Sequence, residues 1–152
     1  MMRSRLFLFL FFAISSFCFG QKEFKKVYQY GDIHKDWALV KTYSGTYGFI
    51  NTEKQIVVQP IYSKIERFGQ HREGWALVKN ISDRYGFIDQ NGKIAVPVIY
   101  AKIEEFGVYK EDWALVKSNS DYYGFIDGNG NEVVPAKYKL EEIKREYPLL
   151  KK

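Results

Sequence analysis

A five-residue motif, Trp-Ala-Leu-Val-Lys, occurs three times in the chain and limits the fold more than any other feature. The copies begin at Trp37, Trp75 and Trp113, so the same interval separates each copy from the next. After a short polar stretch, each copy is followed by Tyr-Gly-Phe-Ile and then Asn or Asp. A fixed period of about 20–50 residues is typical of repeat proteins, in which each copy forms one structural unit. The sequence therefore predicts an array of similar units.

The similarity extends beyond these motifs. The segments Trp75–Tyr100 and Trp113–Tyr138 are identical at most aligned positions, and Trp37–Tyr62 matches Trp75–Tyr100 at more than half of them. A truncated copy precedes the first, because Phe24 and Val27 fall at the positions of Tyr62 and Ile65. The predicted divisions of the chain are 1–20 (signal peptide), 21–36 (partial leading repeat), 37–74 (repeat 1), 75–112 (repeat 2), 113–138 (repeat 3) and 139–152 (C-terminal cap).

The segment 1–20 has the order of a secretory signal peptide. Two arginines precede an apolar run, Leu6–Ile14, and small residues follow. The run is too short for a membrane span of about 20 residues, so we expect no transmembrane segment in the mature chain. We expect cleavage after Gly20 and export to the periplasm or the medium. Lipid attachment at Cys18 is less favoured, because the bulky Phe17 precedes the thiol.

The chain after Gly20 contains no cysteine, so the exported protein must be held together by its core rather than by disulfides. It carries 21 basic and 18 acidic side chains, and no basic block precedes Lys151-Lys152. A mixed surface of this kind gives no nucleic-acid groove, so we expect no nucleic-acid partner.

Each repeat contains three segments that alternate like β-strands. In repeat 2 these are residues 75–79, 85–89 and 94–96, which are rich in aromatic and branched side chains. Short loops join them, so an antiparallel three-stranded meander is the simplest arrangement. One meander has too little core to be stable alone, so neighbouring units must stack.

The turns and strand ends follow from glycine and proline. Asn91-Gly92 predicts a type I′ hairpin turn, whereas residues 51–55 of repeat 1 lack the glycine and should turn differently or less favourably. We expect Pro97 and Pro135 to end the third strand, because proline cannot donate to the ladder.

The connector between repeats has the pattern Tyr100-x-x-Ile103-x-x-Phe106, which predicts a helical turn or a bent strand. After repeat 3, polar residues replace the apolar ones at the equivalent positions, as a terminal cap requires. A short amphipathic helix is expected there, formed by Leu140, Ile143 and Tyr147 and ended by Pro148.

These observations predict an all-β fold, a tandem array of three-stranded antiparallel meander repeats with about nine strands in total. An open twisted β-repeat stack is favoured, because propellers typically have about four or more blades. Trefoil-like or propeller-like closure is the alternative.

The motifs resemble those of the WG (KWG) repeat family. The segments that carry the resemblance are Glu73-Gly-Trp-Ala-Leu-Val78, Tyr85-Gly-Phe-Ile-Asp89, Asn91-Gly92, Val96-Pro97 and Tyr100 to Phe106. In place of the tryptophan of the family's Trp-Gly pair, this chain has tyrosine, and its tryptophans lie one strand earlier. The resemblance implies a β-rich architecture and an interaction role, and it carries over no catalytic residues.

Few residues are candidates for chemistry. Trp37, Trp75 and Trp113 could form an exposed row that stacks on sugars or aromatic side chains, although a residue present in every repeat is more often structural. Asp89-x-Asn91-Gly has too few spaced oxygens for calcium and is better explained as a turn. His34 and His71 are not equivalent and have no partner at zinc spacing. We therefore expect no catalytic residues, no cofactor and no metal.

Two functions fit the sequence. The first is an exported, non-catalytic module of the cell envelope that binds a protein or glycan partner through its repeated surface. The second is a cell-envelope hydrolase that uses connector carboxylates, such as Glu104 and Glu105, in a site between repeats. The absence of a recurring nucleophile–histidine pair favours the first.

Overall fold

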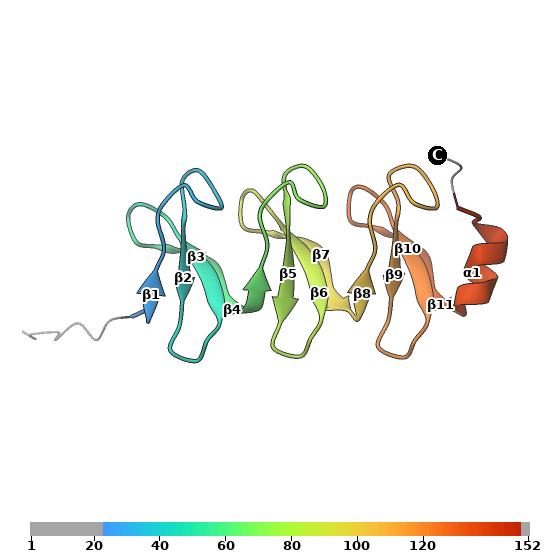
Figure 1. The fold of residues 1–152 in the computed structure, drawn as a ribbon, viewed down its shortest axis with the longest axis horizontal. Coiled ribbons are helices and arrows are strands. Elements are labelled where there is room, and N and C mark those ends of the chain that lie inside the picture. The colour runs from blue at the N-terminus through green and yellow to red at the C-terminus, as the bar shows by residue number, and fades with distance from the viewer. Residues whose placement is uncertain (1–22, 150–152) are drawn as a thin grey trace, which may run out of the picture.

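The computed structural model describes residues 23–149 as a row of three β-units followed by a helix (Figure 1). The predicted signal peptide and Cys18 lie outside these residues. The elements in chain order are β1 (Lys26–Val27), β2 (Ala38–Lys41), β3 (Tyr47–Ile50), β4 (Ile56–Ile65), β5 (Trp75–Asn80), β6 (Tyr85–Asp89), β7 (Ile94–Tyr100), β8 (Lys102–Ile103), β9 (Ala114–Lys117), β10 (Tyr123–Ile126), β11 (Glu132–Tyr138) and α1 (Leu140–Glu146).

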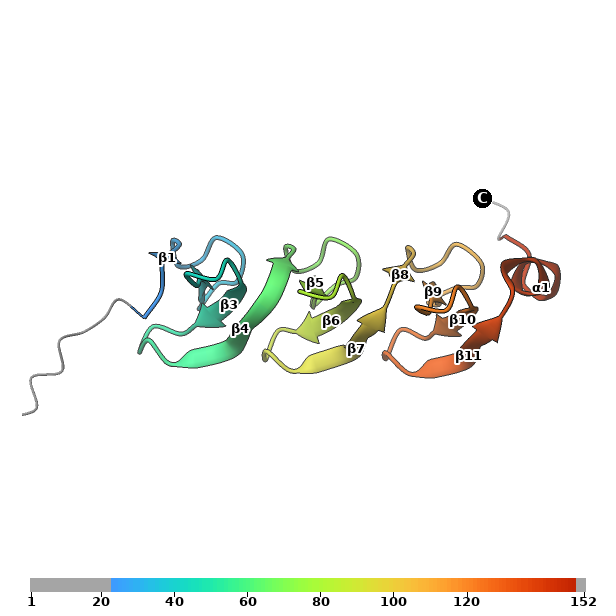
Figure 2. The ribbon, with the colours of Figure 1, turned by 90° about the horizontal axis from the view of Figure 1, so that it is seen from below.

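Each repeat forms an antiparallel three-stranded meander, as predicted, and in repeats 1 and 2 the chain path of the last strand continues into pairing with the next repeat. β4 pairs with β3 and, at its far end, with β5. In repeat 2 the same path is divided into β7 and β8. The result is a seven-stranded sheet from β1 to β7 and a four-stranded sheet of order β11-β10-β9-β8. Figure 2 shows that the units follow one another in an open row, so the array is not closed like a trefoil or a propeller.

The connector is a bent strand, which explains its apolar spacing of three. In β4 the pairing shifts by one residue between Tyr62 and Lys64, leaving a bulge at Ser63. A bulge adds one residue to a strand and breaks its alternation. Tyr62 and Ile65 therefore both point inward and are 4% and 9% exposed. Connector strands of this kind raise the total to eleven strands within residues 23–149, compared with the nine expected.

The core lies between the repeats rather than within them. Each meander has an aromatic face and a small aliphatic face, and the aromatic face of one unit packs on the aliphatic face of the next. Trp37 and Phe49 of repeat 1 thus share a cluster with Ala76, Val78 and Ile88 of repeat 2. The equivalent cluster between repeats 2 and 3 contains Phe87, Val96, Tyr100, Ala114, Val116 and Ile126.

Both ends of the row are covered by substitutes for a missing neighbour. At the first end, Phe24 of the partial leading repeat packs on the aliphatic face of repeat 1. At the other end, the predicted helix forms, and its Ile143 is 2% exposed against Leu115 and Phe125 of repeat 3. Tyr147 lies 5.1 Å from the Phe125 ring, centroid to centroid, and so replaces the connector phenylalanine of the earlier repeats.

The Asn-Gly turns do not have the predicted type I′ geometry. A type I′ turn needs positive φ at both central residues, but only the glycine has it, with φ of 79° at Gly92. The Gly92 N–H donates to the Asp89 carbonyl, and the Asp89 N–H donates to the Lys93 carbonyl. This pattern is a type I turn followed by a left-handed residue in a bulge.

Repeat 1 forms the same turn without a glycine. Lys54 takes the left-handed position with φ of 64°, and its N–H donates to the Asn51 carbonyl. The turn therefore does not differ in shape, although a non-glycine residue in this region is strained by about 1–2 kcal/mol.

The glycine of each Tyr-Gly-Phe-Ile motif is required by a close approach of two strands. A Cβ on Gly86 would lie 2.6 Å from the Val96 carbonyl oxygen and 2.8 Å from the Val98 Cα, both of which are backbone atoms. The opposite strand bulges there, because Tyr85 pairs with Tyr100 but Phe87 pairs with Val96. Pro97 lies inside this bulge and Pro135 inside the equivalent bulge of β11, so neither ends its strand as predicted. Bulges are among the few sheet positions that tolerate proline.

Within residues 23–149, no helix is long and apolar enough to cross a membrane.

Gly86→Ala is expected to lower the free energy of unfolding by about 3 kcal/mol or more, because its methyl group would overlap backbone that cannot rotate away. Gly69→Ala is the control, since a Cβ there meets nothing within 4 Å and only the φ of 80° opposes it. That change should cost about 1 kcal/mol. Urea unfolding followed by circular dichroism measures both, and equal costs would contradict the close-approach argument.

Lys54→Gly is expected to raise the free energy of unfolding by about 0.5–1 kcal/mol, because relief of the left-handed strain exceeds the added freedom of the unfolded chain. The converse change, Gly92→Lys, should be destabilising by about 2 kcal/mol. The lysine would be strained by the left-handed backbone, and its Cβ would also crowd Val58 and Val57. Differential scanning calorimetry of both variants checks the signs, and a destabilised Lys54→Gly protein would contradict the argument.

Candidate interaction surface

The tryptophan row lies at the seams between units. Trp37 is 8% exposed, and Trp75 and Trp113 are half-buried. The Trp37 ring lies 5.6 Å from Phe49 and 6.2 Å from Phe68, centroid to centroid. The other two tryptophans make matching contacts with Phe87 and Phe106 in repeat 2 and with Phe125 and Tyr147 in repeat 3.

The side chain three positions before each tryptophan lies over its ring. His34 stacks on Trp37 with centroids 3.7 Å apart, and the Lys110 ammonium lies 3.7 Å above the Trp113 ring. In repeat 2 the Arg72 guanidinium lies 5.2 Å from the Trp75 ring and also pairs with Asp112. These side chains occupy ring faces on which a ligand would have to stack, and stacking on the row stays a prediction.

The Asp-x-Asn-Gly segments use their carboxylates within the turn. Asp89 Oδ1 accepts hydrogen bonds from the backbone N–H groups of Asn91 and Lys93, both at 2.9 Å. Asp127 does the same in repeat 3. Among residues 23–149, no group of three His, Cys, Asp or Glu side chains is arranged to hold a metal ion.

A second repeated constellation lies where the first strand of each repeat meets the preceding connector. Two lysines face each other across the strands in every unit, because Lys64 pairs with Lys79 and Lys102 pairs with Lys117. The equivalent pair in repeat 1 is Lys26 with Lys41. Side chains directly opposite in a sheet have Cβ atoms about 5 Å apart, so each pair concentrates positive charge.

Each of these sites also contains a tyrosine from the second strand. The ammonium groups of Lys41, Lys79 and Lys117 lie 5.1, 5.5 and 5.9 Å from the ring centroids of their partner tyrosines. The partners are Tyr47, Tyr85 and Tyr123. We call these three lysine pairs with their tyrosines the lysine–tyrosine edge. The hairpin turns next to them, which follow β2, β5 and β9, all project from one long side of the row (Figure 1, lower side).

In repeats 2 and 3, carboxylates neutralise the lysine pairs. Lys64 Nζ lies 2.6 Å from Glu66, and Lys79 Nζ lies 2.6 Å from Asp83. The hydrogen bond to Asp83 raises the pKa of Lys79, and the same contact lowers the pKa of Asp83. Repeat 3 has the equivalent pairs Lys102–Glu104 and Lys117–Asp121.

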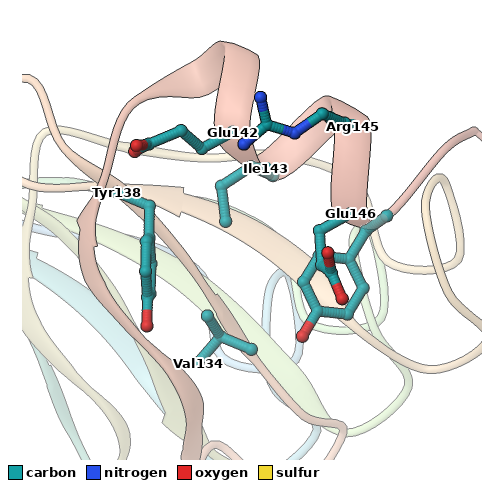
Figure 3. Close-up of a pocket in the computed structure, with 7 residues that line it drawn as sticks. Val134, Tyr138, Glu142, Ile143, Arg145 and Glu146 are labelled. Atoms are coloured by element: carbon teal, nitrogen blue, oxygen red, sulfur yellow. The ribbon is translucent and has the colours of Figure 1, made fainter.

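A pocket of ≈ 340 Å³ lies at the C-terminal end of the row, between β11 and α1. Figure 3 shows Val134 and Tyr138 of β11 on one side and Ile143 and Arg145 of α1 on the other. Tyr138 is 38% exposed, whereas its equivalents in repeats 1 and 2 are 4% exposed beneath the following unit. The pocket is therefore the part of the stacking surface that the cap helix leaves open.

Sequence reasoning identified the tryptophans but missed the lysine pairs. The recurrence of Lys41, Lys79 and Lys117 at the period of the tryptophans was a visible signal. Their partners could not be read from the sequence, because the bulge at Ser63 decides which connector residue faces Lys79.

Comparison with known proteins gives one result. A family model described as "WG containing repeat" matches residues 47–80, 85–122 and 123–140, which together are more than half of the chain. No curated protein and no solved structure matches the chain.

Proposed function

Because the chain belongs to the WG-repeat family, we propose that it is an exported, non-catalytic binding module of the cell envelope. Its partner would be a protein or a glycan. The lysine–tyrosine edge is the proposed contact surface.

The observation that carries this proposal is the repetition of one partly exposed constellation at the same register in every unit. The lysine pairs are opposite one another in all three repeats. The hairpin turns next to these sites project from one side of an open row (Figure 1), and extended repeat surfaces of this kind are commonly used for binding. The tryptophans recur as well, but their rings already contact the core.

The lowered pKa of Glu66 does not favour acid–base chemistry at this carboxyl group. A glycoside hydrolase needs one carboxyl group kept protonated by a raised pKa. Partial burial alone would raise the pKa of Glu66, but hydrogen bonds from Lys64 and His71 hold it below its usual value. Of the connector acids, Glu104 pairs with Lys102, and Glu105 lines a pocket with His71 and Phe106. The lysine contacts of Glu66 and Glu104 do not favour the hydrolase alternative.

The export part of the proposal depends on residues 1–20, whose sequence has the charge and apolar pattern of a signal peptide.

The binding part predicts that charge on the lysine–tyrosine edge matters more than charge elsewhere. Lys41→Gln with Lys79→Gln should lower retention of the chain on a glycan panel or an envelope-protein extract at least tenfold. The control, Lys54→Gln with Lys93→Gln, removes the same charge from repeats 1 and 2 at the opposite end of the second strand. It should change retention less than twofold. Surface plasmon resonance measures both variants.

Equal losses in the two variants would reduce the effect to net charge and contradict the assignment of the edge. Trp75→Ala tests whether the tryptophan row is the contact surface instead. The Trp75 ring contacts Phe87 and Phe106, so removing it should destabilise the fold. Lost retention by a Trp75→Ala protein of unchanged stability would move the contact surface to the tryptophan row.

The export part predicts a mature protein that begins at Gln21 and is recovered outside the cytoplasm. Mass spectrometry of the intact protein from cell fractions checks this. An acylated Cys18, or a chain that keeps residues 1–20, would contradict cleavage after Gly20.

A further inference from the structure

Repeat 1 differs from the other two repeats in the charges around its lysine pair. Glu66 and Glu104 occupy one position next to the pair in repeats 2 and 3, and repeat 1 has Tyr28 there. A second position holds Asp83 and Asp121, and repeat 1 has Gly45 there. Both carboxylates that neutralise the pair elsewhere are therefore replaced by uncharged residues.

The backbone hydrogen bonds around the pair are the same in all three units, and the turn position is left-handed in each, with φ of 92° at Gly45 and 59° at Asp83. The N–H of Tyr28 donates to the Leu39 carbonyl at 2.8 Å, as the N–H of Glu66 does to Leu77 at 2.9 Å. The turn that contains Gly45 also keeps its hydrogen bond, since the Gly45 N–H donates to the Thr42 carbonyl at 3.1 Å. The fold of a unit does not require the two carboxylates.

The lysine pair of repeat 1 has tyrosine rings as partners instead of anions. The Lys26 ammonium lies 4.1 Å from the centroid of Tyr28, and the Lys41 ammonium lies 5.1 Å from that of Tyr47. A hydrogen bond to Tyr47 raises the pKa of Lys41, which keeps this lysine charged. Among residues 23–149, no ion pair involves Lys26 or Lys41. Two like charges opposite each other in a sheet repel, and an anion between them would remove that repulsion.

We propose that the lysine pair of repeat 1 is a binding site for an oxyanion group of an acidic glycan. This inference rests on the proposed function and deepens it, because it selects one unit and one class of partner. The ligand's carboxylate or sulfate takes the place that Glu66 and Asp83 fill in repeat 2. In repeats 2 and 3 the chain's own glutamate and aspartate side chains already neutralise the lysine pairs.

The aromatic side chains favour a sugar over an acidic peptide. Tyr43 stands on the hairpin turn just after Lys41 and is 66% exposed. The equivalent residues are Ile81 in repeat 2 and Asn119 in repeat 3, so a tyrosine here is particular to repeat 1. The C–H face of a sugar ring packs well on an exposed aromatic ring, which offers a large apolar surface next to a polar hydroxyl. Ammonium and aromatic groups together match a sugar acid.

Isothermal titration calorimetry of the exported chain with oligogalacturonate tests the site. One binding event is expected, and it should weaken as salt is added, because exposed charges are screened. The fully methyl-esterified oligosaccharide has the same rings without the charge, and it should bind at least tenfold more weakly. Equal binding of the ester would overturn the proposal.

The internal repeats provide matched variants. Tyr28→Glu with Gly45→Asp gives repeat 1 the carboxylates of repeat 2, and it should weaken binding of oligogalacturonate at least tenfold. Glu66→Tyr with Ile81→Tyr and Asp83→Gly gives repeat 2 the residues of repeat 1, and it should raise the stoichiometry from one site to two. Thermal unfolding confirms that both variants fold. Unchanged binding in the first variant would overturn the proposal, even if the second fails to fold.

Two further outcomes separate this inference from the proposed function. If oligoglutamate of equal charge binds as tightly as oligogalacturonate, the site takes acidic chains in general and the glycan assignment is wrong. If oligogalacturonate does not bind, but Lys41→Gln with Lys79→Gln still lowers retention on another partner, the inference fails while the proposed function stands.

Discussion

Contact between unlike faces holds the row together. The aromatic face of each meander packs on the small aliphatic face of the next, so Trp37 and Phe49 of one unit meet Ala76 and Val78 of its neighbour. Both alanine and valine are fully buried there, because only small side chains leave room for the rings. The alternation of large and small residues in Trp-Ala-Leu-Val-Lys is therefore a packing requirement. It explains why this motif recurs in all three copies, since each copy packs on a neighbouring unit or on the residues that cover an end of the row.

The same constraint accounts for the ends of the row. A unit without a neighbour would expose one face, and the chain covers the two exposed faces differently. Phe24 covers the aliphatic face of repeat 1 with one side chain, whereas Ile143 and Tyr147 of α1 cover the aromatic face of repeat 3. The absence of a preceding unit also explains Lys54, because the equivalent residue in repeat 2 is Gly92, where a Cβ would lie 3.0 Å from the Val58 side chain of repeat 1. Repeat 1 has no full unit before it, so a side chain fits at this position.

The strands, the stacking and the cap helix could be predicted because each depends on a short-range pattern. Alternation along residues 75–79 identifies a strand, and polar replacement after Tyr138 identifies a terminus. The connector and the turns could not be predicted, because each depends on what lies opposite. A bulge at Ser63 turns an apparent helical spacing into a strand. Asn91 permits two turn types, and the structure adopts the one in which Gly92 alone is left-handed.

The lysine pairs could not be predicted either, because they too depend on which residues lie opposite each other. The residues next to each pair also differ between repeat 1 and the other two repeats. Lys64 and Lys79 are separated in the chain by the rest of the connector, and only the register of β4 on β5 brings them together. Packing constrains the faces of a unit but not this edge, which is why Tyr28 and Gly45 can differ from Glu66 and Asp83 without any change in the hydrogen bonds of the backbone. Glycine at position 45 has a backbone reason, because its φ of 92° is left-handed, whereas the replacement of Glu66 by Tyr28 has none. Charge left unbalanced at one end of an otherwise uniform row is best understood as complementary to something outside the chain.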